Sequence, residues 1–107
     1  MDPSRLISEI ITNYERHGWK LRRALLTPET RKQIAHRFPG AIRVVDTDLN
    51  ALWFARTSHE GREAWELRLV AENPYALFEA FDAEKTENDR EEKRTQMEQR
   101  MREYLAR

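Results

Sequence analysis

The chain has no cysteine, only three glycines and four prolines, and no long apolar run. Without cysteine there can be neither a disulfide framework nor a thiolate metal site. No apolar stretch approaches the length of about 20 residues that a membrane-spanning helix needs. The segment Met1–Ile11 contains Asp2, Arg5 and Glu9, so it does not resemble a secretory signal. We therefore expect a soluble, cytoplasmic protein that does not contact membranes.

What the chain does have is charge. Of its 107 residues, 19 are Lys or Arg and 19 are Asp or Glu, which gives a net charge of zero. Residues 1–40 hold eight basic and four acidic residues, residues 41–82 hold four and eight, and residues 83–107 hold seven of each. Such an asymmetry marks either an interaction surface or two parts of one chain that lie against each other. The length predicts one domain, residues 1–107.

The first third of the chain predicts a helix, a strand and a short helix. Apolar residues from Leu6 to Tyr14 recur at helical spacing, which predicts a helix over 3–17 that ends at Gly18. Residues 19–26 alternate between apolar and polar, as a strand does. Thr27-Pro28-Glu29 then has the pattern of a helix start, and Pro39-Gly40 stop that short helix.

The middle of the chain changes to a period of two. The alternation predicts strands over 42–45, 51–56 and 63–70, with short loops that are typical of an antiparallel meander. Residues 75–81 fit a fourth strand, or else the start of one long helix that continues to the C-terminus. We favour the strand, because the turn at Asn73-Pro74 follows the preceding strand directly.

The last segment, 84–107, is rich in Glu, Lys, Arg and Gln and contains neither Gly nor Pro, so it predicts a helix. Its apolar side chains lie only in the last two turns, and we expect the first half to project into solvent. The fold class is therefore α+β. Its expected elements are an N-terminal helix, a strand, a short helix, a three- or four-stranded antiparallel meander and a charged C-terminal helix.

Two short motifs resemble a calcium-binding loop and a catalytic triad, but each lacks residues or geometry that such a site needs. Asp46, Asp48 and Asn50 match the first ligands of a calcium loop, but Ala51 and Thr57 stand where that loop needs Gly and Glu. Ser58-His59-Glu60 holds a hydroxyl, an imidazole and a carboxylate, but chain neighbours point apart and do not form a triad. The three histidines (His17, His36 and His59) and the pair Glu63 and Glu66 do not converge either. We predict no metal, no cofactor and no catalytic residue.

A basic and aromatic stretch, Trp19-Lys20-Leu21-Arg22-Arg23, keeps nucleic acid as an alternative partner. Cationic grooves with stacked aromatic rings hold single strands, and Trp53 with Arg56 could extend such a surface. The zero net charge argues against it, because dedicated nucleic-acid binders are usually basic.

The predicted sheet is apolar on both faces. In the strand 51–56, Leu52 and Phe54 point one way while Ala51, Trp53 and Ala55 point the other. An antiparallel sheet with one wet face should alternate apolar and polar residues. Either helices of the same chain cover both faces, or another chain completes one of them.

These observations favour a non-catalytic protein-interaction or assembly module that acts as a homo-oligomer or with a protein partner. The predicted interaction surface consists of Trp53, Phe54, Arg56, Arg22 and Arg23. The alternatives are a nucleic-acid-binding domain, and a small-ligand-binding protein or enzyme without a recognisable motif.

Overall fold

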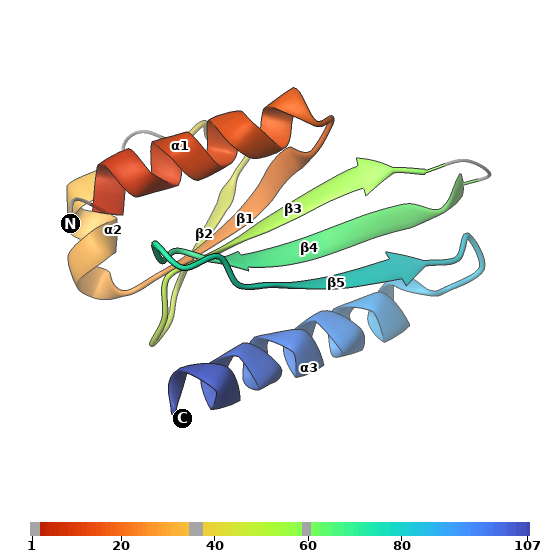
Figure 1. The fold of residues 1–107 in the computed structure, drawn as a ribbon. Coiled ribbons are helices and arrows are strands. Elements are labelled where there is room, and N and C mark those ends of the chain that lie inside the picture. Colours follow the sequence, from red (N-terminus) through yellow and green to blue (C-terminus); the bar gives the residue numbers. More distant parts are fainter. Residues whose placement is uncertain (1–2, 35–37, 59–60) are drawn as a thin grey trace.

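A computed structural model describes residues 3–34, 38–58 and 61–107 of the chain. Its elements follow one another in the order helix, strand, helix, four strands, helix (Figure 1). They are α1 (Pro3–Arg16), β1 (Lys20–Leu26), α2 (Pro28–Ile34), β2 (Arg43–Asp46), β3 (Ala51–Thr57), β4 (Glu63–Leu69), β5 (Ala76–Phe81) and α3 (Glu87–Leu105). The fold is α+β, as predicted. The predicted segments lie within about three residues of these bounds, except that the predicted end of the short helix follows residues 35–37, which lie outside the described ranges.

The strands form one five-stranded sheet in the order β2-β1-β3-β4-β5. Strands β3, β4 and β5 form the expected antiparallel meander, and β1 pairs antiparallel with β3. The meander prediction is wrong for β2, which pairs parallel with β1 at the far edge. The reason is that α2 and the segment after it carry the chain back to the end where β1 began, as a parallel pair requires.

Residues 76–81 are a strand, which resolves the ambiguity in favour of the predicted alternative. β5 pairs with β4 along its whole length, from Phe81 opposite Glu63 to Ala76 opposite Arg68. The tight turn between the two strands is closed by a hydrogen bond from Leu69 N to Tyr75 O at 2.9 Å. The backbone groups of this segment are thus satisfied by a ladder rather than by helix.

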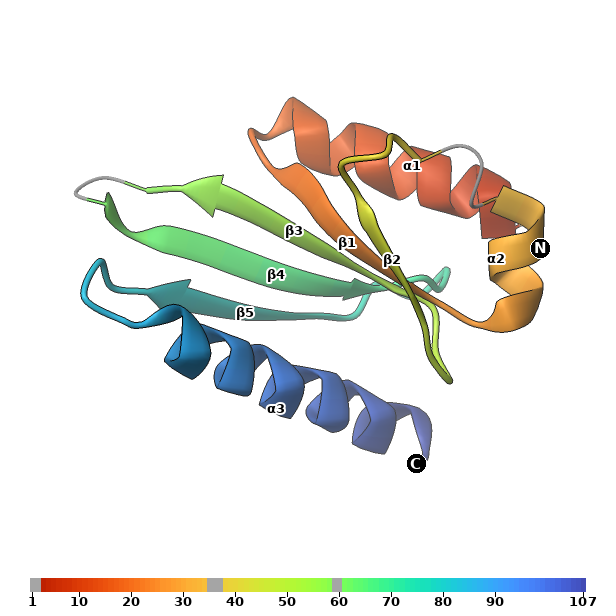
Figure 2. The same ribbon diagram turned by 180° about the vertical axis from the view of Figure 1, so that it is seen from behind.

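Helices lie on both faces of the sheet (Figures 1 and 2). On one face, Met97 and Met101 of α3 pack in a cluster with Trp53, Trp65 and Leu67. On the other face, α1 and α2 pack over a second cluster, whose buried members are Ile7, Ile10, Trp19, Ala24, Leu26, Ile34, Leu52, Phe54 and Ala64. Most of the doubly apolar sheet is therefore covered by the chain itself.

The first half of α3 lies against the sheet, although we expected it to project. It packs through two cationic side chains rather than through apolar ones. The Arg94 guanidinium lies 3.9 Å from the centre of the Trp65 ring, and that of Arg90 lies 5.8 Å from the centre of Phe81. Arg stems and guanidinium planes cover aromatic faces well, so this half of the helix needs no apolar stripe. Within the described ranges, no helix is both long and apolar enough to cross a membrane.

Candidate functional site

Trp53 and Phe54, two of the five residues of the predicted surface, are core residues. Both are fully buried. Trp53 lies under α3 and donates an indole hydrogen bond to Glu98 at 2.8 Å, while Phe54 stacks on Tyr14 of α1 with ring centres 4.1 Å apart. Successive side chains of β3 point to opposite faces, and each face has its own helix. Neither residue can therefore form part of the surface of the folded chain.

The three predicted arginines reach the surface on two different faces. Arg56 lies on the α1 side, 4.5 Å above the centre of the Trp19 ring, and donates to His17 O at 3.1 Å. Arg22 and Arg23 stand at a β-bulge in β1 and lie on the α3 side, each within 6 Å of the Trp65 ring. The structure does not bring the predicted residues together into one site.

The α1 side of the sheet is covered only in part. α1 lies over the β1 and β2 side and leaves the neighbouring face of β4 and β5 open (Figure 1). On this open face β5 presents Ala76, Phe78 and Ala80, all exposed. Phe78 is 58% exposed, the most exposed large apolar side chain among the described residues. An exposed strand face that consists only of apolar residues is unusual for a free surface.

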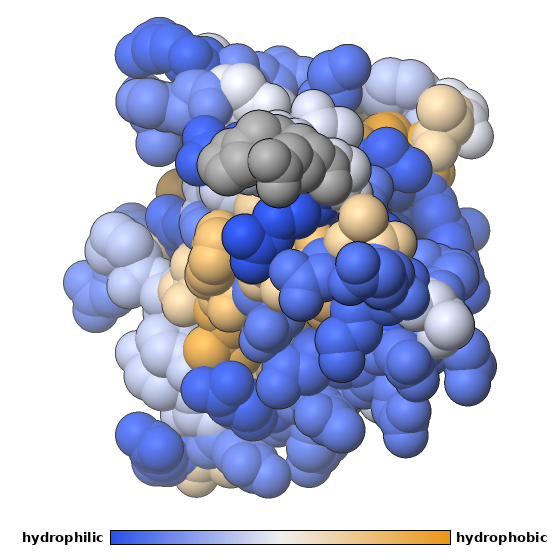
Figure 3. Space-filling model, turned by 90° about the vertical axis from the view of Figure 1, so that its right-hand side faces the viewer, coloured by the Kyte–Doolittle hydropathy of each residue, from blue (hydrophilic) through white to orange (hydrophobic). Residues whose placement is uncertain are grey.

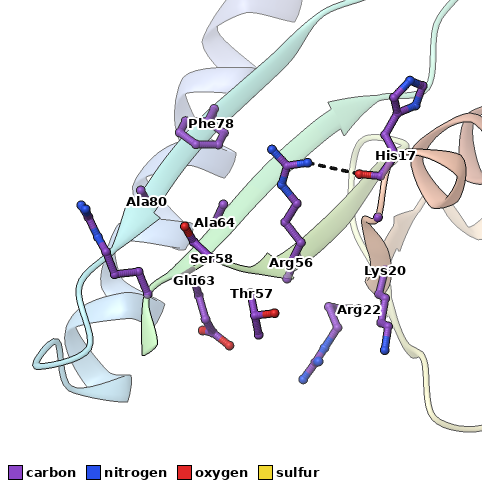
Figure 4. Close-up of a pocket in the computed structure, with 13 residues that line it drawn as sticks. His17, Lys20, Arg22, Arg56, Thr57, Ser58, Glu63, Ala64, Phe78 and Ala80 are labelled. Carbon is purple, nitrogen blue, oxygen red and sulfur yellow. Dashed lines mark hydrogen bonds between the residues drawn. The ribbon is translucent and has the colours of Figure 1, made fainter. Parts of the chain in front are cut away.

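Phe78 borders a concavity of about 750 Å³, which we call the Phe78 pocket. Figure 3 looks at this end of the molecule and shows apolar residues at the surface with hydrophilic ones around them. In Figure 4, Phe78, Ala64 and Arg56 lie on one side of the strands, and Lys20, Arg22 and Thr57 on the other. The pocket thus wraps around the end of the sheet. Its lining comprises His17, Gly18, Lys20, Arg22, Ala55, Arg56, Thr57, Ser58, Arg62, Glu63, Ala64, Phe78 and Ala80.

The rim of the Phe78 pocket is cationic. Four Lys or Arg side chains line it against one carboxylate, that of Glu63. Glu63 is bound by Arg90 at 2.6 Å, and Arg62 is paired with Asp82 at 3.1 Å. Lys20 and Arg22 have no carboxylate partner in the described part of the chain. A pocket with an apolar floor and surplus positive charge fits an anionic ligand that also carries apolar groups.

The acid nearest to Phe78 on the open face is already engaged. Glu66 stands opposite Phe78 in the strand register and accepts a hydrogen bond from the Tyr14 hydroxyl of α1. Burial, and then this hydrogen bond, raise the pKa of Tyr14 well above its ordinary value of 10. The contact ties α1 to β4.

The three residues of the incomplete calcium motif bind different partners. Asp46 pairs with Arg31 and Asp48 with Arg102, both at 2.8 Å, while Asn50 accepts from Thr27 N at 2.9 Å. Over residues 3–34, 38–58 and 61–107, no three His, Cys, Asp or Glu side chains are grouped as metal ligands would be. His36, His59 and Glu60 lie outside the described residues.

Protein-family models, curated proteins and solved structures were each compared with the chain, and none matches. The sequence predicted a sheet that is apolar on both faces, but it did not single out Phe78 or Arg62, and Lys20 was considered only within the basic stretch that begins at Trp19. The period of two in residues 75–81 was the signal that could have placed Phe78 on one face of the sheet. It does not show which strands α1 covers.

Proposed function

We propose that the chain is a non-catalytic protein-interaction module that binds an extended, acidic segment of a partner protein along β5 and in the Phe78 pocket. The observation that supports this most directly is Phe78, an aromatic ring left 58% exposed on an apolar strand face. Leaving most of such a ring in water forgoes part of a burial energy of about 1.5–3 kcal/mol. Exposed aromatic side chains in pockets are frequent anchors of protein interfaces.

The position of β5 supports an extended partner. β5 ends the strand order, so its outer backbone N–H and C=O groups face away from the sheet. An edge of this kind can accept a further strand, whose backbone hydrogen bonds give affinity while pockets beside it select side chains. Ala76 and Ala80 are small and flank Phe78, which leaves room for large apolar side chains of the added strand.

The charge of the rim supports an acidic partner. Lys20, Arg22 and Arg56 line the pocket, and only the first two are free of hydrogen bonds and ion pairs among the described residues. Carboxylates at one end of the partner would meet these cations where the pocket wraps around the ends of β1, β3 and β4. A second copy of this chain would bring an equally cationic rim, which disfavours self-association through this face. Self-association elsewhere and a cytoplasmic location stay predictions.

Fluorescence anisotropy with labelled peptides tests the proposal. The probe is a short peptide that alternates Glu with Leu and Phe, and its matched control carries Lys in place of every Glu. We expect the acidic peptide alone to bind, and we expect F78S to weaken it about tenfold, since anchor side chains contribute about 1.4 kcal/mol or more. L105S is the matched variant, because Leu105 is 47% exposed and lies far along α3. It should bind as the parent does.

Three results would overturn the proposal. The first is equal binding of the acidic and basic peptides, and the second is equal binding by the parent and F78S. The third is a dimer, detected by sedimentation, that the F78S substitution dissociates, because a second copy of the chain would then occupy this face. A short oligothymidylate that binds through Phe78 while the acidic peptide does not would assign the surface to nucleic acid instead.

A further inference from the structure

A second cationic surface lies on the α3 face of the sheet and goes beyond the proposed function, although it shares Arg22 and Glu63 with the Phe78 pocket. It is a groove of about 410 Å³ between β1, β2 and the first half of α3, which we call the arginine groove. Five arginines line it together with Trp65 and two glutamates. The arginines are Arg22, Arg23, Arg43, Arg90 and Arg94.

The strand register places like charges side by side. Arg23 of β1 stands opposite Arg43 of β2, and Arg22 is the neighbouring residue at the bulge. Like charges directly opposite each other destabilise a sheet. A short edge strand such as β2 could carry almost any polar residue at this position. The stability of the sheet therefore does not explain why two arginines stand side by side, and a binding function would.

The nearby carboxylates do not neutralise all of these arginines. Arg23 pairs with Glu91 at 2.9 Å, and Arg90 with Glu63 at 2.6 Å. Arg94 takes both Glu87 and Glu91, each at 2.9 Å. Arg22 and Arg43 are exposed and have no carboxylate partner in the described part of the chain. The charges of these two guanidiniums, one on β1 and one on β2, are thus not neutralised by a carboxylate.

The groove is held in place by the Trp65 ring. The guanidiniums of Arg22, Arg23 and Arg94 lie 5.9, 5.8 and 3.9 Å from its centre. Trp65 is itself buried and donates its indole N–H to Glu63 at 3.2 Å. Arg23 and Arg94 also pair with Glu91, so they are held before a ligand arrives, and preorganisation of this kind favours affinity.

We propose that the arginine groove binds a small phosphate-bearing ligand, with one phosphate group held between Arg22 and Arg43. Guanidinium forks match phosphate oxygens in pairs, and two unpaired arginines balance the two charges of a phosphomonoester. The volume of about 410 Å³ suits a small organic phosphate rather than a bare ion. The carboxylates of Glu63, Glu87 and Glu91 repel the phosphate from the α3 side of the groove, which leaves the side of Arg22 and Arg43 for it.

Calorimetric titration of the full chain at low salt tests this, with pyrophosphate as the probe and succinate as a dianion without phosphate. We expect saturable binding of pyrophosphate and weaker binding of succinate. R43Q should weaken the affinity for pyrophosphate by about tenfold, the loss of a charge-assisted contact. R100Q removes the same charge from an exposed position on α3 and should change the affinity by less than about twofold. F78S should leave it unchanged, which separates this site from the proposed peptide surface.

Four outcomes would overturn the proposal. The first is a failure of pyrophosphate to saturate, the second is equal binding of succinate, and the third is an equal effect of R43Q and R100Q. The fourth is an oligothymidylate that binds in an Arg43-dependent way while pyrophosphate does not, because the groove would then hold a nucleic-acid backbone. R43E provides a second variant. It should abolish binding while it keeps the fold, since its carboxylate would stand opposite Arg23.

Discussion

The guanidinium of Arg94 and the ring of Trp65 form the closest cation–π contact in the described structure, at 3.9 Å, with Arg94 only 2% exposed. Arg94 Nη1 donates to Glu87 and Glu91, but its buried Nε has no acceptor among the described residues. A buried cation that is not fully satisfied adds little net stability, although removing its partners is costly.

The first prediction follows from that contact. R94M retains an unbranched stem against Trp65 and removes the buried charge, so we expect the free energy of unfolding to change by less than about 1 kcal/mol. The double variant E87Q/E91Q leaves the charge without a carboxylate and should lose about 2 kcal/mol, a figure lowered because both acids are partly exposed. Urea unfolding measures both. A larger loss for R94M than for the double variant would contradict this account.

Trp53 and Phe78 should differ sharply in what they contribute to stability. W53A removes a fully buried ring under α3 and should lower the free energy of unfolding by about 3–5 kcal/mol. F78A removes a ring that is mostly in water and should cost about 0.5 kcal/mol or less. Thermal unfolding of the two variants beside the parent checks this. A severe loss in F78A would show that the open face is part of the core.

Relief of like-charge repulsion should make R43Q more stable than the parent when no ligand is present. The expected gain is about 0.2–1 kcal/mol, the usual size of a cross-strand pair effect. It should fade as salt rises, because Arg43 is exposed and screened. R100Q is the control and should show no such gain. A loss of stability in R43Q at low salt would mean that Arg43 supports the fold.

The contact between Tyr14 and Glu66 predicts a specific alkaline weakness. The pKa of Tyr14 is raised in the folded chain, so the folded state keeps its proton where the unfolded state loses it. Stability is therefore fully present below the unfolded value of about 10 and declines as pH rises above it. Y14F removes this dependence and should cost about 1 kcal/mol at neutral pH through the lost hydrogen bond. Urea midpoints measured from about pH 8 to 11 compare the two slopes. Parallel slopes would refute the assignment to Tyr14.

Most elements of the fold are predictable because each begins or ends at a local signal. Gly18 has φ +86° and ends α1, and Thr86 caps α3 by accepting from Asp89 N. The pairing of β2 is not local. The turn after residue 46 suggested that the segments before and after it are neighbours, but β1 lies between them. The spacing of apolar residues predicts that a segment forms a strand, but it does not predict which other strand that segment pairs with.

The candidate site was less predictable for a related reason. The sequence shows that both faces of β3 are apolar, but it does not show which helix covers which strand. Trp53 and Phe54 were therefore assigned to a surface, while the exposed ring belongs to β5. The burial of Arg94 was missed because composition treats arginine as a solvent-facing residue, whereas its plane covers Trp65.

The position of β1 between β2 and β3 has a consequence for how the chain folds. β1 precedes both of its neighbours in sequence, and its pairs with β2 and β3 span about 20–35 residues. The hairpins β3–β4 and β4–β5 close much shorter loops, which costs less entropy. We expect these hairpins to dominate the folding transition state, with β1 inserting later and α1 docking only after it.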